Sequence, residues 1–316
     1  MNSIKNTNKF VLVLFLNQLI LSLFWGLVMD FLNVPLVLNL ILSQICVFGI
    51  PATLYFIYTK ESPKKVLRLN PISFVNILLI IGISIFIQPI MTLLSAITSI
   101  FFTNNVSELL TETDNIPLWL MLIGTALTPA IFEELFFRGI VFYGYKTTSL
   151  IKASLMTGLL FGLMHMDLQQ FLYAFAMGTV FCFLVYKTKS IFASVISHFT
   201  INASQIALYS LLTSSLTTSE IDMSLNPTFM DVMASIFSSI LLVVASLPFL
   251  ALLIWAFLKV NKNTKIDTDE IYYNLPKNMQ EPIATKSLAF AVGIFFLQVI
   301  IIPVIVIFIY IILYGF

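Results

Sequence analysis

Residues 117–144 read PLWLMLIGTALTPAIFEELFFRGIVFYG, a run that is apolar except for three charged side chains, Glu133, Glu134 and Arg138. A helix of about 20 apolar residues crosses the hydrocarbon layer of a membrane. Ionisable groups at that depth cost roughly 2.5–3.5 kcal/mol each on insertion scales, so they persist mainly where they have a function. The stretch therefore predicts a membrane-spanning helix that carries part of a functional site.

The composition of the whole chain places it in the same class. Of its 316 residues, 59% are hydrophobic and 10% are charged, and the mean hydropathy is +1.01, which excludes a soluble domain of this length. The net charge of +1 gives no electrostatic preference for nucleic acid, so we expect no nucleic-acid partner. Cys46 and Cys182 lie in different apolar segments without a CxxC pattern and are predicted to be small buried residues.

Nine apolar runs are candidates for membrane spans. Each must be helical, because backbone groups cannot stay unpaired in lipid and the runs lack the alternation of a β-barrel. The predicted fold is therefore all-α, a polytopic helical membrane protein with about nine transmembrane helices. The candidate spans are residues 10–30, 36–59, 72–102, 117–144, 150–166, 169–187, 190–213, 229–258 and 288–315.

The positive charges predict the orientation of these spans. All 16 Lys and Arg residues lie before the first span or next to the turns that follow spans two, four, six and eight. Positive charge marks the cytoplasmic side, so the N-terminus is predicted to be cytoplasmic and, with an odd number of spans, the C-terminus external. The first span is too long for the apolar core of a signal peptide and is predicted to be an uncleaved anchor. The loops on the opposite side of the membrane, after spans three, five and seven, contain no Lys or Arg and instead carry Glu108, Glu112, Asp114, Asp167, Glu220 and Asp222.

Three parts of the chain are expected. Residues 1–116 hold three N-terminal spans, residues 117–213 form a core of four spans, and residues 214–316 hold two C-terminal spans with a cytoplasmic linker at 259–287. The linker is expected to be solvated rather than a docking site. No internal repeat is found, so a transporter built from inverted repeats has no support.

The only two histidines of the chain, His165 and His198, fall inside apolar spans. His198 shares a helix face with Asn202, four residues later. Glu134 and Arg138 can pair at the same spacing, whereas Glu133 points about 100° away and has no partner nearby in the sequence. At 1.5 Å per residue, Glu133, His165 and His198 lie about 12–21 Å from the cytoplasmic ends of their spans, so they could meet in one cavity inside the membrane.

These groups suit hydrolysis. A glutamate paired with a histidine can remove a proton from water that attacks a carbonyl, and a histidine N–H with the Asn202 amide can stabilise the resulting oxyanion. The alternative is a zinc site formed by Glu133, His165 and His198 with an open position for water. The chain has no HExxH motif and Asn202 has no role in that scheme, so water activation without a metal is favoured.

Three motifs in this order resemble the type II CAAX prenyl endopeptidase and bacteriocin-processing (CPBP) membrane protease family over residues 117–205. The motifs are Glu133-Glu134-x-x-x-Arg138, Phe161-x-x-x-His165 and His198-x-x-x-Asn202, supported by Pro129, Gly139, Gly178 and residues 188–193. Lys189 departs from the pattern, because a small residue is commoner there, and this bears on substrate entry.

The resemblance implies a helical intramembrane protease. Glu133 and His165 would activate water, His198 and Asn202 would form the oxyanion hole, and Glu134 and Arg138 would support the site. Older descriptions of the family call it metal-dependent, so zinc is the alternative to having no cofactor. The expected protein is an integral, multi-pass component of a bacterial cell membrane whose partners are the lipid bilayer and a peptide or membrane-protein substrate.

A different function remains as the alternative. Some proteins of this family look like self-immunity factors against bacteriocins, or like scaffolds that regulate other membrane proteins. A pure scaffold has no need of buried ionisable groups such as Glu133 and His165, which favours the enzyme. The sequence does not predict the substrate or the oligomeric state.

Overall fold

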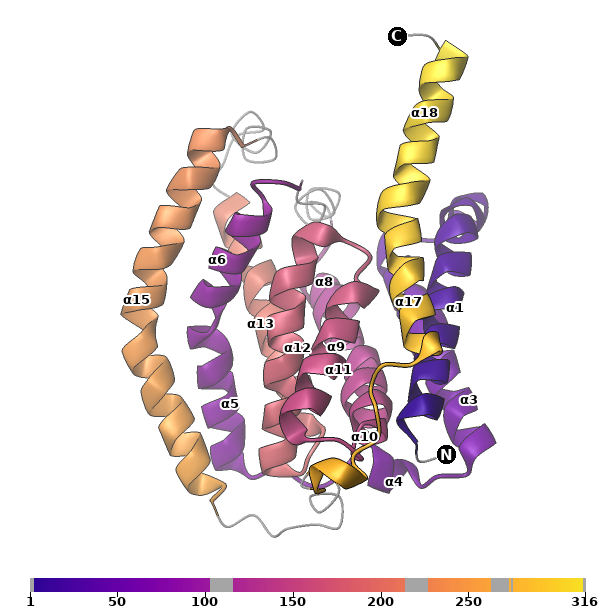
Figure 1. The fold of residues 1–316 in the computed structure, drawn as a ribbon. Coiled ribbons are helices and arrows are strands. Elements are labelled where there is room, and N and C mark those ends of the chain that lie inside the picture. Colours follow the sequence, from indigo (N-terminus) through magenta and orange to yellow (C-terminus); the bar gives the residue numbers. More distant parts are fainter. Residues whose placement is uncertain (1–2, 103–115, 214–226, 263–272, 274, 315–316) are drawn as a thin grey trace.

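The computed structural model describes residues 3–102, 116–213, 227–262, 273 and 275–314 (Figure 1). Every regular element in these ranges is a helix, which confirms the predicted all-α class. Several acidic loop residues used to predict the orientation lie outside the described ranges, namely Glu108, Glu112, Asp114, Glu220 and Asp222.

The helices follow the predicted spans closely. Several spans consist of two or more helical segments joined without a break, and four short π-helical stretches (η1, η2, η3 and η5) occur inside three of them. The bounds are α1 Ile4–Phe31, α2 Leu36–Gln44, η1 Ile45–Gly49, α3 Ile50–Thr59, α4 Pro63–Val66, α5 Phe74–Phe86, α6 Gln88–Thr98, α8 Leu118–Met121, η2 Leu122–Leu127, α9 Thr128–Glu134, η3 Leu135–Val141, α10 Phe142–Gly144, α11 Leu150–Met164, α12 Leu168–Thr188, α13 Phe192–Thr213, α15 Phe229–Val260, η4 Lys277–Met279, α17 Lys286–Phe296, η5 Leu297–Ile301 and α18 Ile302–Tyr314.

The protein is an integral, multi-pass membrane protein. Within the described ranges, seven helices are long and apolar enough to cross a membrane. The two other predicted spans are also helical, but α11 has only 15 residues and α13 carries polar side chains, His198 and Asn202 among them. The predicted number of nine is therefore approximate. The N- and C-terminal ends lie at opposite ends of the bundle, as an odd number of crossings requires (Figure 1).

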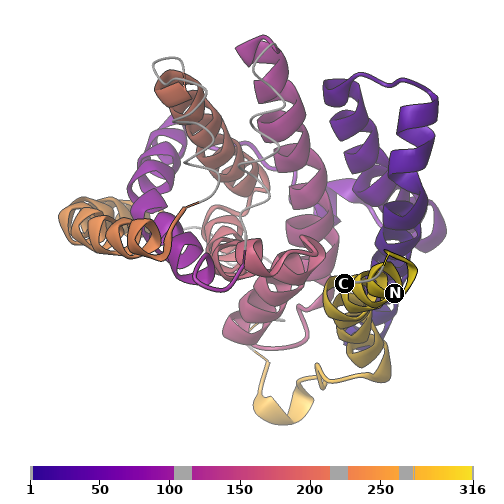
Figure 2. The same ribbon diagram turned by 90° about the horizontal axis from the view of Figure 1, so that it is seen from above.

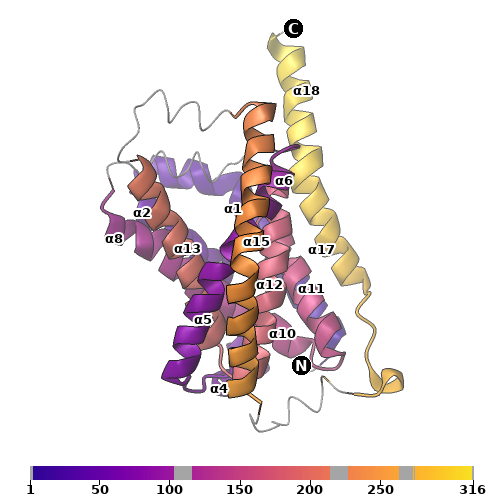
Figure 3. The ribbon, with the colours of Figure 1, turned by 90° about the vertical axis from the view of Figure 1, so that its left-hand side faces the viewer.

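The core of the bundle is formed by the fourth span (α8 to α10) with α11, α12 and α13. On one side α5 packs against α13 and α6 against α12, and α15 covers α5 and α6 from outside. On the other side α1, α2 and η1 contact the fourth span, and α17 packs along α1 (Figures 2 and 3). The core is thus flanked on both sides by N-terminal spans, and on each side a C-terminal span packs against one of them. Cys46 and Cys182 are both free, and Cys182 is buried.

A tight hairpin of α11 and α12 fixes the position of His165. The chain reverses at Met166, whose φ of 51° is left-handed, and the Asp167 carboxylate accepts hydrogen bonds from the first N–H groups of α12. The two helices approach closely at Gly158, where an added Cβ would lie 2.7 Å from the carbonyl oxygen of Phe175. Small residues allow such close contact between membrane helices. His165 is therefore held at the end of α11 by the geometry of the turn.

The fourth span departs from regular α-helical geometry just before Pro129. Proline has no N–H to donate and its ring crowds the preceding turn, so a regular α-helix is disrupted there. In the structure the π-helical stretch η2 comes directly before Thr128, whose hydroxyl donates to the carbonyl of Ile123 at 2.7 Å. A second π-helical stretch, η3, begins right after Glu134. Glu133 and Glu134 lie on α9, the short α-helical segment between η2 and η3. Such π-helical stretches are frequent at functional sites.

Two described residues of the linker at 259–287, Tyr273 and Glu281, are docked on the rest of the protein. Tyr273 is 2% exposed, its ring stacks on that of Phe142 at 5.0 Å, and its hydroxyl donates to the Phe142 carbonyl at 2.7 Å. The hydroxyl also accepts a hydrogen bond from Arg68 Nη2 at 3.1 Å. Further along, Glu281 accepts a hydrogen bond from the N–H of Ile4 at 2.7 Å. The expectation of a solvated linker is therefore wrong for these residues, because an aromatic ring and a carboxylate anchor them.

Candidate active site

A cavity of about 320 Å³ lies inside the core of the bundle. Four of the predicted catalytic residues line it: Glu133 from α9, His165 from the end of α11, and His198 and Asn202 from α13. Apolar side chains form much of the remaining wall, including Met91, Ala174, Met177, Phe181, Ile201 and Ile206. The structure thus brings together residues that are widely separated in the sequence, in a largely apolar setting.

Glu134 and Arg138 form a fully buried ion pair next to this cavity. Arg138 Nη1 donates to Glu134 Oε1 at 2.8 Å, and neither side chain is exposed. The guanidinium carbon also lies 4.2 Å from the centre of the Phe161 ring and 4.9 Å from that of Phe181. Cation–π contacts of this kind stabilise a positive charge that is removed from water. The pairing predicted from the i,i+4 spacing is confirmed.

Gly178 on α12 leaves room for this guanidinium. A Cβ at this position would lie 3.2 Å from Arg138 Nη2 and 2.8 Å from the Cα of Gly158. A larger residue would therefore push against the arginine and against α11. The lack of space for a Cβ explains why a glycine stands at position 178, one of the residues that supported the family resemblance.

His198 is held by the same carboxylate. Its Nδ1 lies 2.9 Å from Glu134 Oε1, and the residue is 6% exposed. Glu134 accepts from Arg138 as well, so the carboxylate is the acceptor and Nδ1 carries the proton. In the neutral ring Nε2 is then an acceptor, and it can donate to an oxyanion only when the ring is doubly protonated. The family resemblance implied a supporting role for Glu134, but nothing in the sequence indicated this contact with His198.

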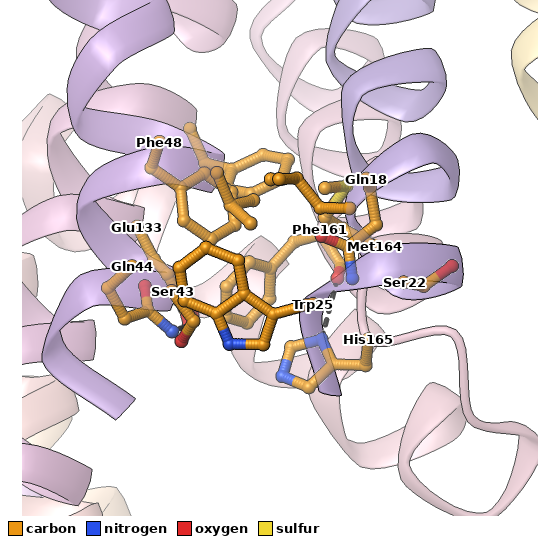
Figure 4. A pocket seen from close by; sticks show the side chains of 13 residues that line it. Gln18, Ser22, Trp25, Ser43, Gln44, Phe48, Glu133, Phe161, Met164 and His165 are labelled. Carbon is orange, nitrogen blue, oxygen red and sulfur yellow. Dashed lines mark hydrogen bonds between the residues drawn. The ribbon is translucent and has the colours of Figure 1, made fainter. Parts of the chain in front are cut away.

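His165 also has a defined tautomer, because its Nδ1 faces a group that can only accept a hydrogen bond. Its Nδ1 lies 2.8 Å from the carbonyl oxygen of Phe161, and the dashed line at His165 in Figure 4 marks this bond. A carbonyl oxygen can only accept, so Nδ1 carries the proton and Nε2 keeps its lone pair. The half-buried His165 is therefore set up as a proton acceptor at Nε2.

Glu133 and Asn202 have partners that the sequence analysis did not predict. Gln44 Nε2, from α2, donates to Glu133 Oε1 at 3.1 Å, and Glu133 is only 9% exposed. Asn202 Nδ2 donates to the backbone carbonyl of Thr125 at 3.2 Å. The available signal for Gln44 was its polarity within a mostly apolar second span, which also carries Asn39 and Ser43.

A second cavity, of about 270 Å³, adjoins the first on the side of α1 and α2 (Figure 4). Five residues line both cavities and form the wall between them: Ser43, Gln44, Glu133, Phe161 and His165. The second cavity is further lined by Gln18, Ser22, Trp25 and several apolar side chains. The groups proposed to activate water therefore lie where two spaces meet.

The side chains do not fit the alternative zinc site. Within the described ranges, no group of three or more His, Cys, Asp or Glu side chains is arranged to hold a metal ion. The bonds at Nδ1 of His165 and His198 leave Nε2 of both rings free, as they also would in a metal ligand, so the placement of the three side chains is what counts against zinc. A zinc site formed by Glu133, His165 and His198 would require these side chains to rearrange, so we derive no step through a metal.

Comparison with known proteins gives matches over the part of the chain that carries this site. Residues 115–204 match the family model of the type II CAAX prenyl endopeptidase Rce1-like proteins. The chain is also 37% identical over 84 residues to a Bacillus subtilis (strain 168) protein named "Putative membrane peptidase YdiL". That alignment covers 26% of this chain and 34% of the relative. No solved structure matches the chain. The family resemblance drawn from the sequence motifs is confirmed for this part of the chain.

Proposed function

We propose that this protein is an intramembrane endopeptidase that hydrolyses a peptide bond in a membrane-associated or lipidated peptide or protein, since residues 115–204 match the Rce1-like family model. The observation that supports the proposal most strongly is that Glu133, His165, His198 and Asn202 line one cavity within the membrane-spanning core. Ionisable groups are rare at such depth unless they have a function. A hydrolase needs a base for water and donors for an oxyanion, and these four residues can supply both.

Water is activated by Glu133 and His165 in this proposal. The water donates one hydrogen bond to His165 Nε2. The Glu133 carboxylate removes the other proton of the water while the water oxygen bonds to the carbonyl carbon of the substrate. The carbonyl π bond breaks and its electron pair moves to the oxygen, which becomes the oxyanion of a tetrahedral intermediate. The orientation of His165 is set in advance by its bond to the Phe161 carbonyl.

Asn202 and His198 stabilise that oxyanion. The Asn202 amide has two N–H groups, so one can donate to the oxyanion while the other stays on the Thr125 carbonyl. His198 donates from Nε2 when its ring is doubly protonated, and the Glu134 carboxylate lies where it pairs with that charge. The intermediate collapses when the C–N bond breaks and the proton held by Glu133 passes to the leaving nitrogen. The products are a new carboxyl terminus and a new amino terminus.

Quantitative profiling of protein and peptide termini tests this proposal in cells. Four strains are compared: wild type, a deletion, Glu133→Gln, and Glu61→Gln as a matched control outside both cavities. We expect the deletion and Glu133→Gln to lose the same termini, and Glu61→Gln to retain them at equal membrane abundance. If Glu133→Gln keeps every product, the chain is not a glutamate-dependent protease and the scaffolding function becomes the better account.

A further inference from the structure

The geometry points to Gln44 as a positioning residue for Glu133, supplied by a helix outside the matched domain. Gln44 is the last residue of α2, whereas the family match covers residues 115–204. Its Nε2 donates to Glu133 Oε1 at 3.1 Å, and both side chains lie in the wall between the two cavities. The inference rests on the proposed function, because it assigns a partner to the proposed base.

Glycines allow the second span to lie close to the fourth span. An added Cβ at Gly49 would lie 2.9 Å from the ring of Phe132, the residue before Glu133. An added Cβ at Gly124, on the fourth span, would lie 3.1 Å from the Val37 side chain of α2. Both distances are shorter than ordinary van der Waals contact, so a larger residue at either position would press against the other span. The two glycines therefore permit the close approach of the second and fourth spans along the segment that contains Gln44.

The local geometry of the second span also changes at Gln44. The α-helix ends there and the π-helical stretch η1 begins at Ile45, which alters the direction of the following side chains. In this mostly apolar span, the half-buried Gln44 amide is directed at a carboxylate on another helix. An amide donor at this position holds one carboxylate oxygen of Glu133 in place. The other oxygen is then the one that can receive a proton from water.

Two substitutions separate positioning from packing. Gln44→Met keeps the approximate size and removes the donor, whereas Gln44→Glu keeps the shape and places a second carboxylate against Glu133. The same glutamine-to-methionine change at Gln298, a half-buried residue of η5 that lines neither cavity, is the control. The substrate is a peptide that contains a cleavage site found by terminal profiling, assayed with the purified full-length protein in liposomes.

We expect kcat to fall about 10- to 100-fold in both Gln44 variants, the range found for residues that orient metal ligands. KM should stay within about threefold of wild type, because the donor acts through Glu133 and not on the bound peptide. A role in packing alone would leave Gln44→Glu close to wild type. Near-wild-type kcat in both variants would overturn the inference while leaving the proposed function intact. Equal cleavage by wild type and Glu133→Gln would overturn both.

A thermal unfolding cycle gives a readout that needs no substrate. Wild type, Gln44→Met, Glu133→Gln and the double variant are compared in the same detergent. Residues in contact give effects that do not add, whereas independent residues give effects that do. We expect the Tm changes of the single variants not to sum to that of the double variant. Additive Tm changes would show that the contact is absent and would overturn the inference.

Discussion

His198 Nδ1 lies 2.9 Å from the Oε1 atom of Glu134, the same oxygen that accepts from Arg138. One carboxylate therefore fixes both the buried arginine and the histidine proposed to face the oxyanion. This gives the second glutamate of the motif a role distinct from that of Glu133. Glu133 faces the cavities, whereas Glu134 is fully buried behind them.

Removal of the Glu134 charge should destabilise the protein. Breaking a buried ion pair by removing one partner typically costs about 3–5 kcal/mol, because the other charge stays buried and unpaired. We expect Glu134→Gln to lower the Tm of the purified protein markedly, and Glu133→Gln to change it little. Differential scanning fluorimetry in detergent measures both. Equal Tm values for the two variants would contradict the separate roles.

Enlargement of Gly178 should displace Arg138. Gly178→Leu places its side chain against Arg138 Nη2 and the Gly158 backbone, so we expect a loss of folded protein and of activity. Gly26 on α1 is the matched control, because nothing lies within 4 Å of an added Cβ there. Size-exclusion chromatography of detergent extracts measures the folded fraction. Comparable yields of monodisperse protein from Gly178→Leu and Gly26→Leu would refute the packing account.

The docked linker should depend on Tyr273. Tyr273→Ala removes the ring that stacks on Phe142 and the hydroxyl that bonds the Phe142 carbonyl and Arg68, leaving buried polar groups unpaired. We expect trypsin to cut the linker faster in this variant, for example after Lys277. Tyr58→Ala is the control, because Tyr58 is 80% exposed. Cleavage at the wild-type rate in Tyr273→Ala would mean that Tyr273 does not anchor the linker.

Metal removal should leave cleavage unchanged. The proposed mechanism uses Glu133 and His165 to activate water directly, so an excess of 1,10-phenanthroline should not lower kcat with the reconstituted protein and an identified peptide. Loss of activity that added zinc restores would instead support the zinc site of Glu133, His165 and His198.

Much of this architecture could be predicted from the sequence, because the membrane limits the backbone to helices and charges are costly inside it. The same physics indicated that Glu133, His165 and His198 share a depth, and their spacing indicated the Glu134–Arg138 pair. Contacts between distant segments left no such pattern. Gln44 lies far from Glu133 in the chain, and nothing in its own span indicates which helix it faces.

The docking of the linker was missed for a related reason. A segment with charges on both sides of Tyr273 is typical of solvated loops, and one aromatic ring does not indicate a binding surface. The surface that buries Tyr273 is assembled from Arg68, Phe142 and Tyr186, which come from three separate parts of the chain. Only the folded arrangement brings them together.

The most direct test of the central claim is the turnover number of Glu133→Gln, measured with the purified protein in liposomes and a peptide that wild type cleaves. General base catalysis by a positioned side chain contributes about 10²–10⁴-fold, so we predict a loss of kcat in that range with an unchanged Tm. A kcat within about twofold of wild type would contradict the account, because Glu133 could not then be the base that activates water.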